Sequence, residues 1–231
     1  MQAQSMSSWQ QWLHHPERSR LRQALFHIHL WIGAILSAYI LWMSFTGSVL
    51  VFRDAFSPRY SLDWLVKLHA DLGSGVTGRM VNGVGALGLI LLCLTGAVIW
   101  WPGIAHWRRS LTVSWGAKFP RISWDLHSAL SVWGFLFLME WGVSSVYFAF
   151  PQLFDSLLVL DPKDRFTDSA LYWLSNLHFG RFGWFTEIVW SIMGLVAAIL
   201  GFTGVFICCR RIIYQKPSNP KLDPHSAPTP H

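Results

Sequence analysis

Charged residues are scarce in this chain: only 13% of its 231 residues are Asp, Glu, Lys or Arg, whereas 52% are hydrophobic. An ordinary soluble domain has about 25% charged residues. The mean hydropathy of +0.35 points away from that class as well. Cysteine is also rare. All three cysteines lie within or at the end of apolar runs, and no Cys-x-x-Cys or Cys/His zinc spacing is present, which excludes a cysteine-based zinc module.

Four apolar runs are long enough to cross a bilayer, which requires about 20 residues each. They cover approximately residues 27–52, 80–101, 127–150 and 188–209. Within hydrocarbon each backbone N–H and C=O must be satisfied inside its own segment, so these runs are predicted to be helices. The first run is too long for the apolar region of a signal peptide, and we expect it to stay as an uncleaved span.

A short motif occurs twice in the chain. Residues 64–69 read Trp-Leu-Val-Lys-Leu-His and residues 173–178 read Trp-Leu-Ser-Asn-Leu-His. From His69 to Thr95-Gly96 is 26 residues, and from His178 to Thr203-Gly204 it is 25. A repeat at near-constant spacing indicates two similar halves. We therefore predict an all-α integral membrane protein whose four transmembrane helices form two repeated hairpins, with short outer amphipathic helices.

The basic residues are concentrated in three of the segments outside the predicted spans. The net charge is +6, and most Lys and Arg residues lie before the first span, between the second and third, and after the fourth. The other two loops carry most of the acids. The positive-inside rule therefore places both termini in the cytoplasm, and the basic excess reflects topology rather than nucleic-acid binding.

This pattern divides the chain into three parts. Residues 1–26 are expected to be a cytoplasmic amphipathic segment at the membrane surface. Residues 27–210 are expected to be the four-helix domain, with repeats at about 27–102 and 126–210. Residues 211–231 are rich in Pro and Ser and are expected to form a disordered cytoplasmic tail.

Two histidines lie near the start of the first span, and only one can face the bundle core. His27 and His29 are about 200° apart on a helix. One turn further on, His29 has Gly33, whereas His27 has Trp31. Small residues allow a neighbouring helix or a flat cofactor to approach closely, so we expect His29 to point inward. His127 opens the third span with a small residue, serine, in the corresponding place.

Four histidines then stand in two pairs, His29 with His127 on the inner side and His69 with His178 on the outer side. Imidazole is costly within a membrane and needs a partner. Two imidazoles facing one another suit haem iron ligated on both axial faces. A zinc site needs about four ligands, and non-haem iron favours carboxylates. We predict two b-type haems, one near each face; four interfacial histidines without a cofactor are the alternative.

Three further polar residues are candidates for the site. Arg79 and Arg181 each follow an outer histidine and are expected to bind haem propionates, the alternative being ordinary interfacial positioning of long basic side chains. Glu140 lies in the middle of the third span. An intramembrane carboxylate indicates a proton or polar role; the alternative is a protonated glutamic acid hydrogen-bonded to a neighbouring helix.

The chain resembles the PepSY-associated transmembrane family over most of residues 25–210. The order and spacing of several short motifs carry the resemblance: His29-Leu30-Trp31-Ile32-Gly33, Thr46-Gly47, Leu68-His69-Ala70-Asp71-Leu72-Gly73, Thr95-Gly96, Trp100-Trp101-Pro102 and Leu126-His127. The resemblance implies a multi-pass protein of the bacterial inner membrane linked to iron uptake. Some members of the family are dihaem reductases of ferric siderophores, and the resemblance implies that His29, His69, His127 and His178 are the ligands.

The chain departs from the longer family members because it has no soluble periplasmic insert. It also has no flavin or nicotinamide motif, so the electron donor is expected to be another protein or a membrane quinol. We predict an oxidoreductase that passes electrons from the cytoplasmic side, or from quinol, to a periplasmic acceptor such as a ferric siderophore. A proton- or metal-coupled transporter that uses Glu140 and the histidines is one alternative, and a cofactor-free membrane anchor subunit is another.

Overall fold

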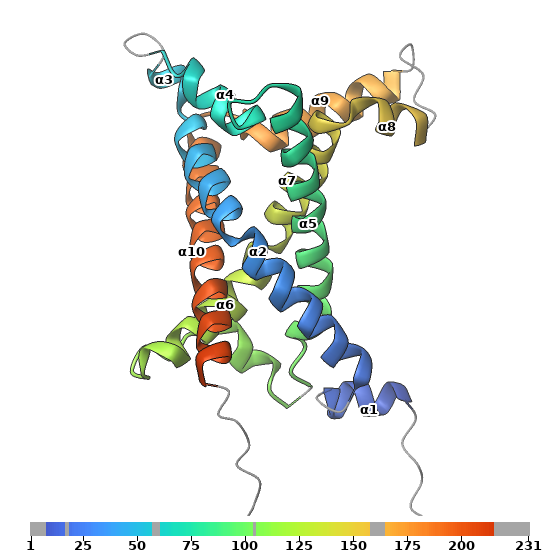
Figure 1. Cartoon of the computed structure of the whole chain (residues 1–231), viewed down its shortest axis with the longest axis vertical. Helices are drawn as coiled ribbons and strands as arrows, with labels where there is room; N and C mark the ends of the chain where they lie inside the picture. Colours follow the sequence, from blue (N-terminus) through green and yellow to red (C-terminus); the bar gives the residue numbers. More distant parts are fainter. Residues whose placement is uncertain (1–7, 17–18, 57–60, 104, 158–164, 215–231) are drawn as a thin grey trace, which may run out of the picture.

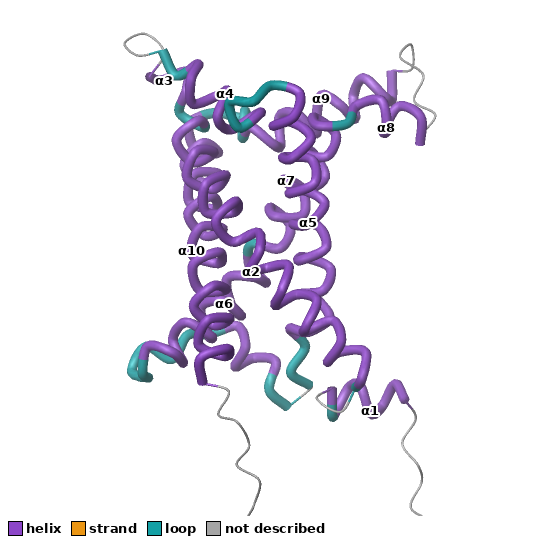
Figure 2. Tube along the Cα trace, in the orientation of Figure 1, coloured by secondary structure: helices purple, strands orange, loops and turns teal. Residues whose placement is uncertain are grey.

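The computed structural model describes residues 8–16, 19–56, 61–103, 105–157 and 165–214 (Figure 1). These residues are helical with short connections, and no strand occurs among them (Figure 2). The all-α prediction is therefore confirmed.

The helices that are long and apolar enough to cross a membrane are α2 (Arg20–Leu50), α5 (Val76–Trp100) and α10 (Trp184–Tyr214). Two shorter helices, α6 (Phe119–Trp133) and α7 (Phe135–Ala149), pass the same test as a pair. The chain is therefore an all-α, multi-pass membrane protein, as the four apolar runs predict.

The third span was expected to be one helix, and this expectation is wrong. The axes of α6 and α7 meet at 66°. Gly134 lies at the break, and a methyl group there would lie 3.1 Å from the Leu130 carbonyl oxygen and 3.4 Å from Val196 of α10. Sharp bends without proline commonly fall at glycine. The bend gives the two halves different neighbours: α7 packs mainly on α5 and α6 mainly on α10, while α2 packs on both α5 and α10.

Short helices gather at the two ends of the bundle (Figure 1). We call the end with α1 (Ser8–His14), the 3-10 helix η2 (Trp107–Leu111) and the last turn of α10 the terminal end. The opposite end, which we call the distal end, carries four short helices: α3 (Arg53–Phe56), α4 (Asp63–Asp71), α8 (Pro151–Leu157) and α9 (Arg165–Phe179).

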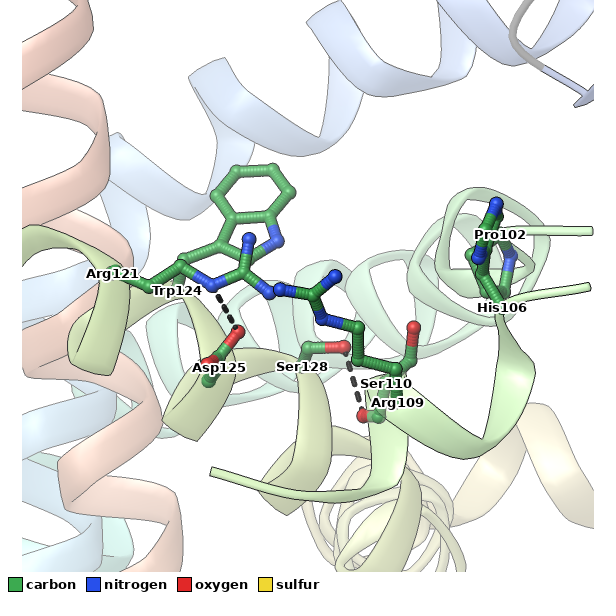
Figure 3. Close-up of a pocket in the computed structure, with 8 residues that line it drawn as sticks. All are labelled: Pro102, His106, Arg109, Ser110, Arg121, Trp124, Asp125 and Ser128. Carbon is green, nitrogen blue, oxygen red and sulfur yellow. Dashed lines mark hydrogen bonds and ion pairs between the residues drawn. The ribbon is translucent and has the colours of Figure 1, made fainter. Parts of the chain in front are cut away.

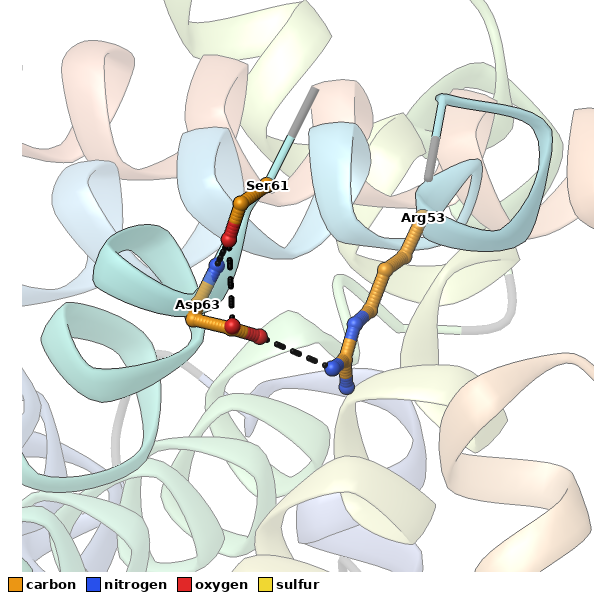
Figure 4. A network of polar contacts seen from close by, with 3 residues as sticks. All are labelled: Arg53, Ser61 and Asp63. Carbon is orange, nitrogen blue, oxygen red and sulfur yellow. Dashed lines mark hydrogen bonds and ion pairs between the residues drawn. The ribbon is translucent and has the colours of Figure 1, made fainter. Parts of the chain in front are cut away.

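A surface network joins α3 to the start of α4 (Figure 4). The Arg53 guanidinium donates to Asp63 Oδ1 at 3.1 Å, and the Ser61 hydroxyl donates to Asp63 Oδ2 at 3.0 Å. The side chains of Arg53 and Asp63 are 44% and 72% exposed. An ion pair this exposed contributes roughly 0–1 kcal/mol to the free energy of unfolding. The network therefore orients the start of α4 relative to α3 but adds little stability.

The glycines of α5 mark close contacts between helices. A methyl group on Gly85 would lie 2.5 Å from the Tyr39 ring, and one on Gly88 would lie 2.3 Å from Leu36 Cδ1. Both partners belong to α2, so α2 and α5 touch along this face. Gly78 is tighter still, because a methyl group there would lie 1.6 Å from the Asp71 carbonyl oxygen at the end of α4.

We expect Gly78→Ala to displace α4 from α5, because backbone atoms occupy the space that the new methyl group needs. Overpacking of this kind typically lowers the free energy of unfolding by about 1–3 kcal/mol. Thermal unfolding of the detergent-solubilised protein measures the loss. Gly116→Ala is the matched control, since nothing lies within 4 Å of a methyl group at that position. Equal stability of the two variants would show that α4 is free to move.

Candidate functional site

The structure brings the inner pair of histidines together. His29 of α2 and His127 of α6 have ring centroids 6.4 Å apart and ring planes at 86°. A metal ion with one imidazole nitrogen about 2 Å away on each side holds two ring centroids roughly 6 Å apart. The two rings are therefore spaced as a pair of axial ligands. His27, in contrast, is exposed and contacts the ring of its neighbour Phe26.

The outer histidines belong to distal helices that lie outside the spans, His69 to α4 and His178 to α9. Burial lowers the pKa of His69 from 6.5 to about 4. Burial, and then the charge of nearby His69, lowers the pKa of His178 from 6.5 to about 3. Both side chains are therefore neutral at pH 7, and neutral imidazole is the form that binds metal ions.

Each of the four histidines is held at Nδ1 by a hydroxyl group of another helix. The partners come from the spans, so the outer histidines do reach the transmembrane helices. The contacts are His29 Nδ1 to Thr95 Oγ1 at 2.9 Å, His69 Nδ1 to Thr46 Oγ1 at 2.8 Å, His127 Nδ1 to Thr203 Oγ1 at 3.0 Å, and His178 Nδ1 to Ser144 Oγ at 2.7 Å.

These hydroxyl groups determine which ring nitrogen carries the proton. Each one also donates to the carbonyl oxygen four residues earlier in its own helix, at 2.7 to 2.9 Å. A hydroxyl group has a single proton, and a carbonyl oxygen only accepts. The hydroxyl oxygen must therefore accept from Nδ1–H, which leaves the lone pair on Nε2. In all four cases the hydroxyl contact is made at Nδ1 and not at Nε2.

Three of the hydroxyl groups belong to Thr-Gly pairs, and the glycine makes room for the imidazole ring. A methyl group on Gly47 would lie 3.2 Å from Cε1 of His69. The corresponding distances are 3.3 Å from Gly96 to His29 and 3.4 Å from Gly204 to His127. The threonine thus orients the ring while the glycine admits it.

Sequence reasoning used the Thr-Gly pairs as landmarks of the repeat and missed their role. It also missed Ser144, which is followed by serine rather than glycine. One signal was available: Ser144 follows His127 by the same number of positions as Thr46 follows His29. Each repeat therefore carries one histidine and one hydroxyl group at matching places in its first span.

Two side chains anchor the ends of the helices that carry the outer histidines. Asn82 Nδ2 donates to the carbonyl oxygens of His69 at 2.7 Å and Ala70 at 2.8 Å. The Trp190 indole N–H donates to the Leu177 carbonyl oxygen in the second repeat. Asn82 and Trp190 come from the spans that follow each helix, so they set how deeply α4 and α9 enter the bundle. An amide within an apolar run was the sequence signal for Asn82.

The other candidates lie near the distal end or within α7. Arg79 and Arg181 are exposed, and the Arg181 guanidinium lies 4.6 Å from the Phe179 ring centroid. Both carboxyl oxygens of Glu140 are buried without a hydrogen-bond partner in the described part of the chain. Glu140 precedes Ser144 by one turn, and its backbone carbonyl accepts from the Ser144 hydroxyl. The alternative interpretation of Glu140, a bond from its carboxyl group to a neighbouring helix, finds no such bond among the described residues.

Within the described ranges, no three His, Cys, Asp or Glu side chains come close enough to hold a metal ion together. The histidines form pairs, and a pair suits a metal that brings its other ligands with it. Haem iron is such a metal, because the porphyrin supplies four nitrogen atoms and leaves two axial positions for the protein.

Residues 57–161 match the family model described as the PepSY-associated TM region, which confirms the predicted resemblance over this part of the chain. The matched region includes one histidine of each pair, His69 and His127. A curated relative, "Uncharacterized protein PA4219" of Pseudomonas aeruginosa, is 32% identical over 85 residues, which are 36% of this chain and 20% of the relative. The match therefore spans a fifth of that relative's length. No solved structure matches the chain.

Proposed function

We propose that this chain, which carries a PepSY-associated TM region, is a dihaem b-type electron carrier of the bacterial inner membrane. It passes electrons from the cytoplasmic side, or from quinol, to a periplasmic acceptor, and ferric siderophores are the acceptor class that the resemblance favours. The observation that carries the proposal is the pairing of four histidines toward opposite ends of one bundle, each held at Nδ1 so that Nε2 is available.

The residues present fit haem in three respects. The inner imidazoles have the spacing of two axial ligands. Both outer imidazoles are neutral at pH 7 because burial lowers the pKa of each. Glycines at three of the four histidines admit the imidazole ring, so each ring can take its place against the neighbouring helix. Haem iron with two imidazole ligands exchanges single electrons.

The chain's own groups determine how the histidines act. The hydroxyl groups orient each ring and increase the basicity of Nε2, as hydrogen-bond partners of metal-bound histidines generally do. The two histidines of each pair would hold the haem iron from both sides, which would leave no position for oxygen or a substrate. The acceptor is therefore reduced at the edge of the distal site, and the exposed cations Arg79 and Arg181 at that end favour an anionic acceptor or the haem propionates.

The charge distribution supports a cytoplasmic location for the terminal end. Arg20 and Arg22 lie in the first turns of α2, and Arg210 and Arg211 lie in the last turns of α10. The positive-inside rule places such residues in the cytoplasm. The inner pair then receives electrons, and the outer pair delivers them.

Vesicles that trap ferricyanide test the transfer directly. With dithionite added outside, we expect vesicles that contain the haem-loaded protein to reduce the trapped ferricyanide, monitored by its absorbance. Vesicles with His127→Ala should reduce it at the rate of protein-free vesicles, because one site of the relay is lost. Equal rates for the wild type and this variant would refute transmembrane transfer.

One observation favours a second function. The carboxyl oxygens of Glu140 are buried without a hydrogen-bond partner in the described part of the chain, and an intramembrane carboxyl group often marks a proton path. A proton-coupled transporter would depend on this residue. Proton flux into vesicles driven by an imposed pH gradient, present in the wild type and lost in Glu140→Gln, would support that function over electron transfer.

A further inference from the structure

A cavity of about 290 Å³ lies at the terminal end, between η2 and the first half of α6 (Figure 3). None of the four paired histidines lines it. Its polar lining includes the side chains of His106, Arg109, Arg121 and Asp125, and the Trp124 ring forms part of the wall. Ligand pockets range from roughly 300 to 1,000 Å³, so this cavity suits a small polar group rather than a whole nucleotide cofactor.

Positive charge in this cavity exceeds negative charge. Figure 3 shows the side chains of Arg109 and Arg121 pointing toward one another beside Trp124. The buried Asp125 carboxylate pairs with Arg121 at 2.9 Å and also accepts from the Ser114 backbone N–H at 3.2 Å. Asp125 is therefore already engaged by Arg121 and the backbone.

Arg109 has no such partner. Its guanidinium makes no hydrogen bond or ion pair within the described part of the chain, although it lines the same cavity as a second guanidinium. Two facing like charges repel one another unless an anion lies between them. The planar fork of a guanidinium matches the oxygen atoms of phosphate, and two forks can hold one phosphate group from two sides.

We infer that this cavity binds a phosphate group, presented either by the headgroup of an anionic phospholipid or by a soluble phosphate ester. The surroundings favour the lipid. Three aromatic side chains of η2, the start of α6 and the segment between them are exposed: Trp107 at 37%, Trp115 at 72% and Phe119 at 55%. Exposed tryptophans beside basic residues are typical of the membrane–water interface, and basic pockets between transmembrane helices bind anionic headgroups. This inference is independent of the haem proposal.

Two binding measurements on the full-length protein in detergent distinguish the sources. In the first, phosphatidylglycerol is titrated into the protein and bound lipid is counted by native mass spectrometry, with phosphatidylcholine as the zwitterionic comparison. In the second, inorganic phosphate is followed by broadening of its phosphorus NMR signal. We expect saturable binding in at least one arm, and preference for phosphatidylglycerol over phosphatidylcholine identifies the lipid as the source.

Arg109→Ala should weaken that binding about tenfold or more, since it removes a charge-assisted bidentate contact. Arg108→Ala is the matched control: Arg108 is the adjacent arginine of η2, lies over the Trp107 ring at 5.4 Å and does not line the cavity. The Arg108→Ala variant should bind the lipid or phosphate as tightly as the wild type does. Arg109 is exposed, so its replacement is not expected to unfold the protein. Equal binding by both variants, or no saturable binding in either arm, overturns the inference.

Discussion

His127→Ala is expected to lower the haem content of the purified protein from two per chain to one, and His29→Ala to remove the same haem. The two imidazole ring centroids lie 6.4 Å apart, so either substitution would leave an iron held between them with one protein ligand. The double variant His29→Ala/His127→Ala should lose no more haem than each single variant does. Haem content is measured by the pyridine haemochrome assay, and a redox titration identifies which haem is left.

His27→Ala is the matched control for this experiment. His27 lies in the same helix as His29, two positions earlier, but its side chain is exposed. The His27→Ala variant should keep both haems. The same logic applies at the distal end, where His69→Ala and His178→Ala should each remove the second haem. If His29→Ala and His127→Ala remove different haems, or if His27→Ala removes one, the pairing is wrong.

Thr95→Val should weaken binding of the inner haem about 10- to 100-fold, the usual effect of losing a hydrogen-bond partner of a metal-bound histidine. Valine keeps the size of threonine but has no hydroxyl group, so His29 Nδ1–H loses its acceptor at 2.9 Å. The imidazole is then free to rotate and to move its proton to Nε2. Haem retention during dilution, together with the midpoint potential of the inner haem, measures the effect.

Thr95→Ser separates the role of the hydroxyl group from that of packing, because serine restores the acceptor and should restore the haem affinity and potential. Thr46→Val is the matched comparison, since Thr46 contacts His69. This substitution should affect the outer haem alone. If serine and valine at position 95 behave alike, the hydroxyl group is not what orients the ring.

The histidines could be selected from the sequence because repetition and helical spacing are properties of the chain itself. The doubled Trp-Leu-x-x-Leu-His motif marked His69 and His178, and the contrast between Gly33 and Trp31 separated His29 from His27. The structure places His29 inward and His27 outward, as that contrast predicts. Local small-residue patterns were sufficient here because helix rotation follows directly from them.

The hydroxyl partners could not be assigned from the sequence. Each contact joins residues of different helices, and the two that link spans to the inner histidines are 66 and 76 positions apart. Which threonine meets which histidine depends on how the helices pack. The Thr-Gly pairs were visible in the sequence, but only the fold shows that Thr46 contacts an outer histidine while Thr95 contacts an inner one.

The bend in the third span was hidden for a similar reason. Hydropathy reports the length of an apolar run and not its direction, so the run at residues 127–150 was expected to be one helix. Gly134 alone is weak evidence for a bend, since glycine is common in transmembrane helices. The bend matters for the site because it directs α6, with His127, toward α10, where Thr203 holds the ring.

The absorption spectrum of the purified protein, taken with a haem assay on the same sample, tests the central claim most directly. Protein from haem-replete cells should show sharpened bands of b-type haem after dithionite reduction, with two haems per chain and no change on addition of carbon monoxide, because both axial positions of each iron are filled. A folded, colourless preparation from such cells would contradict the account.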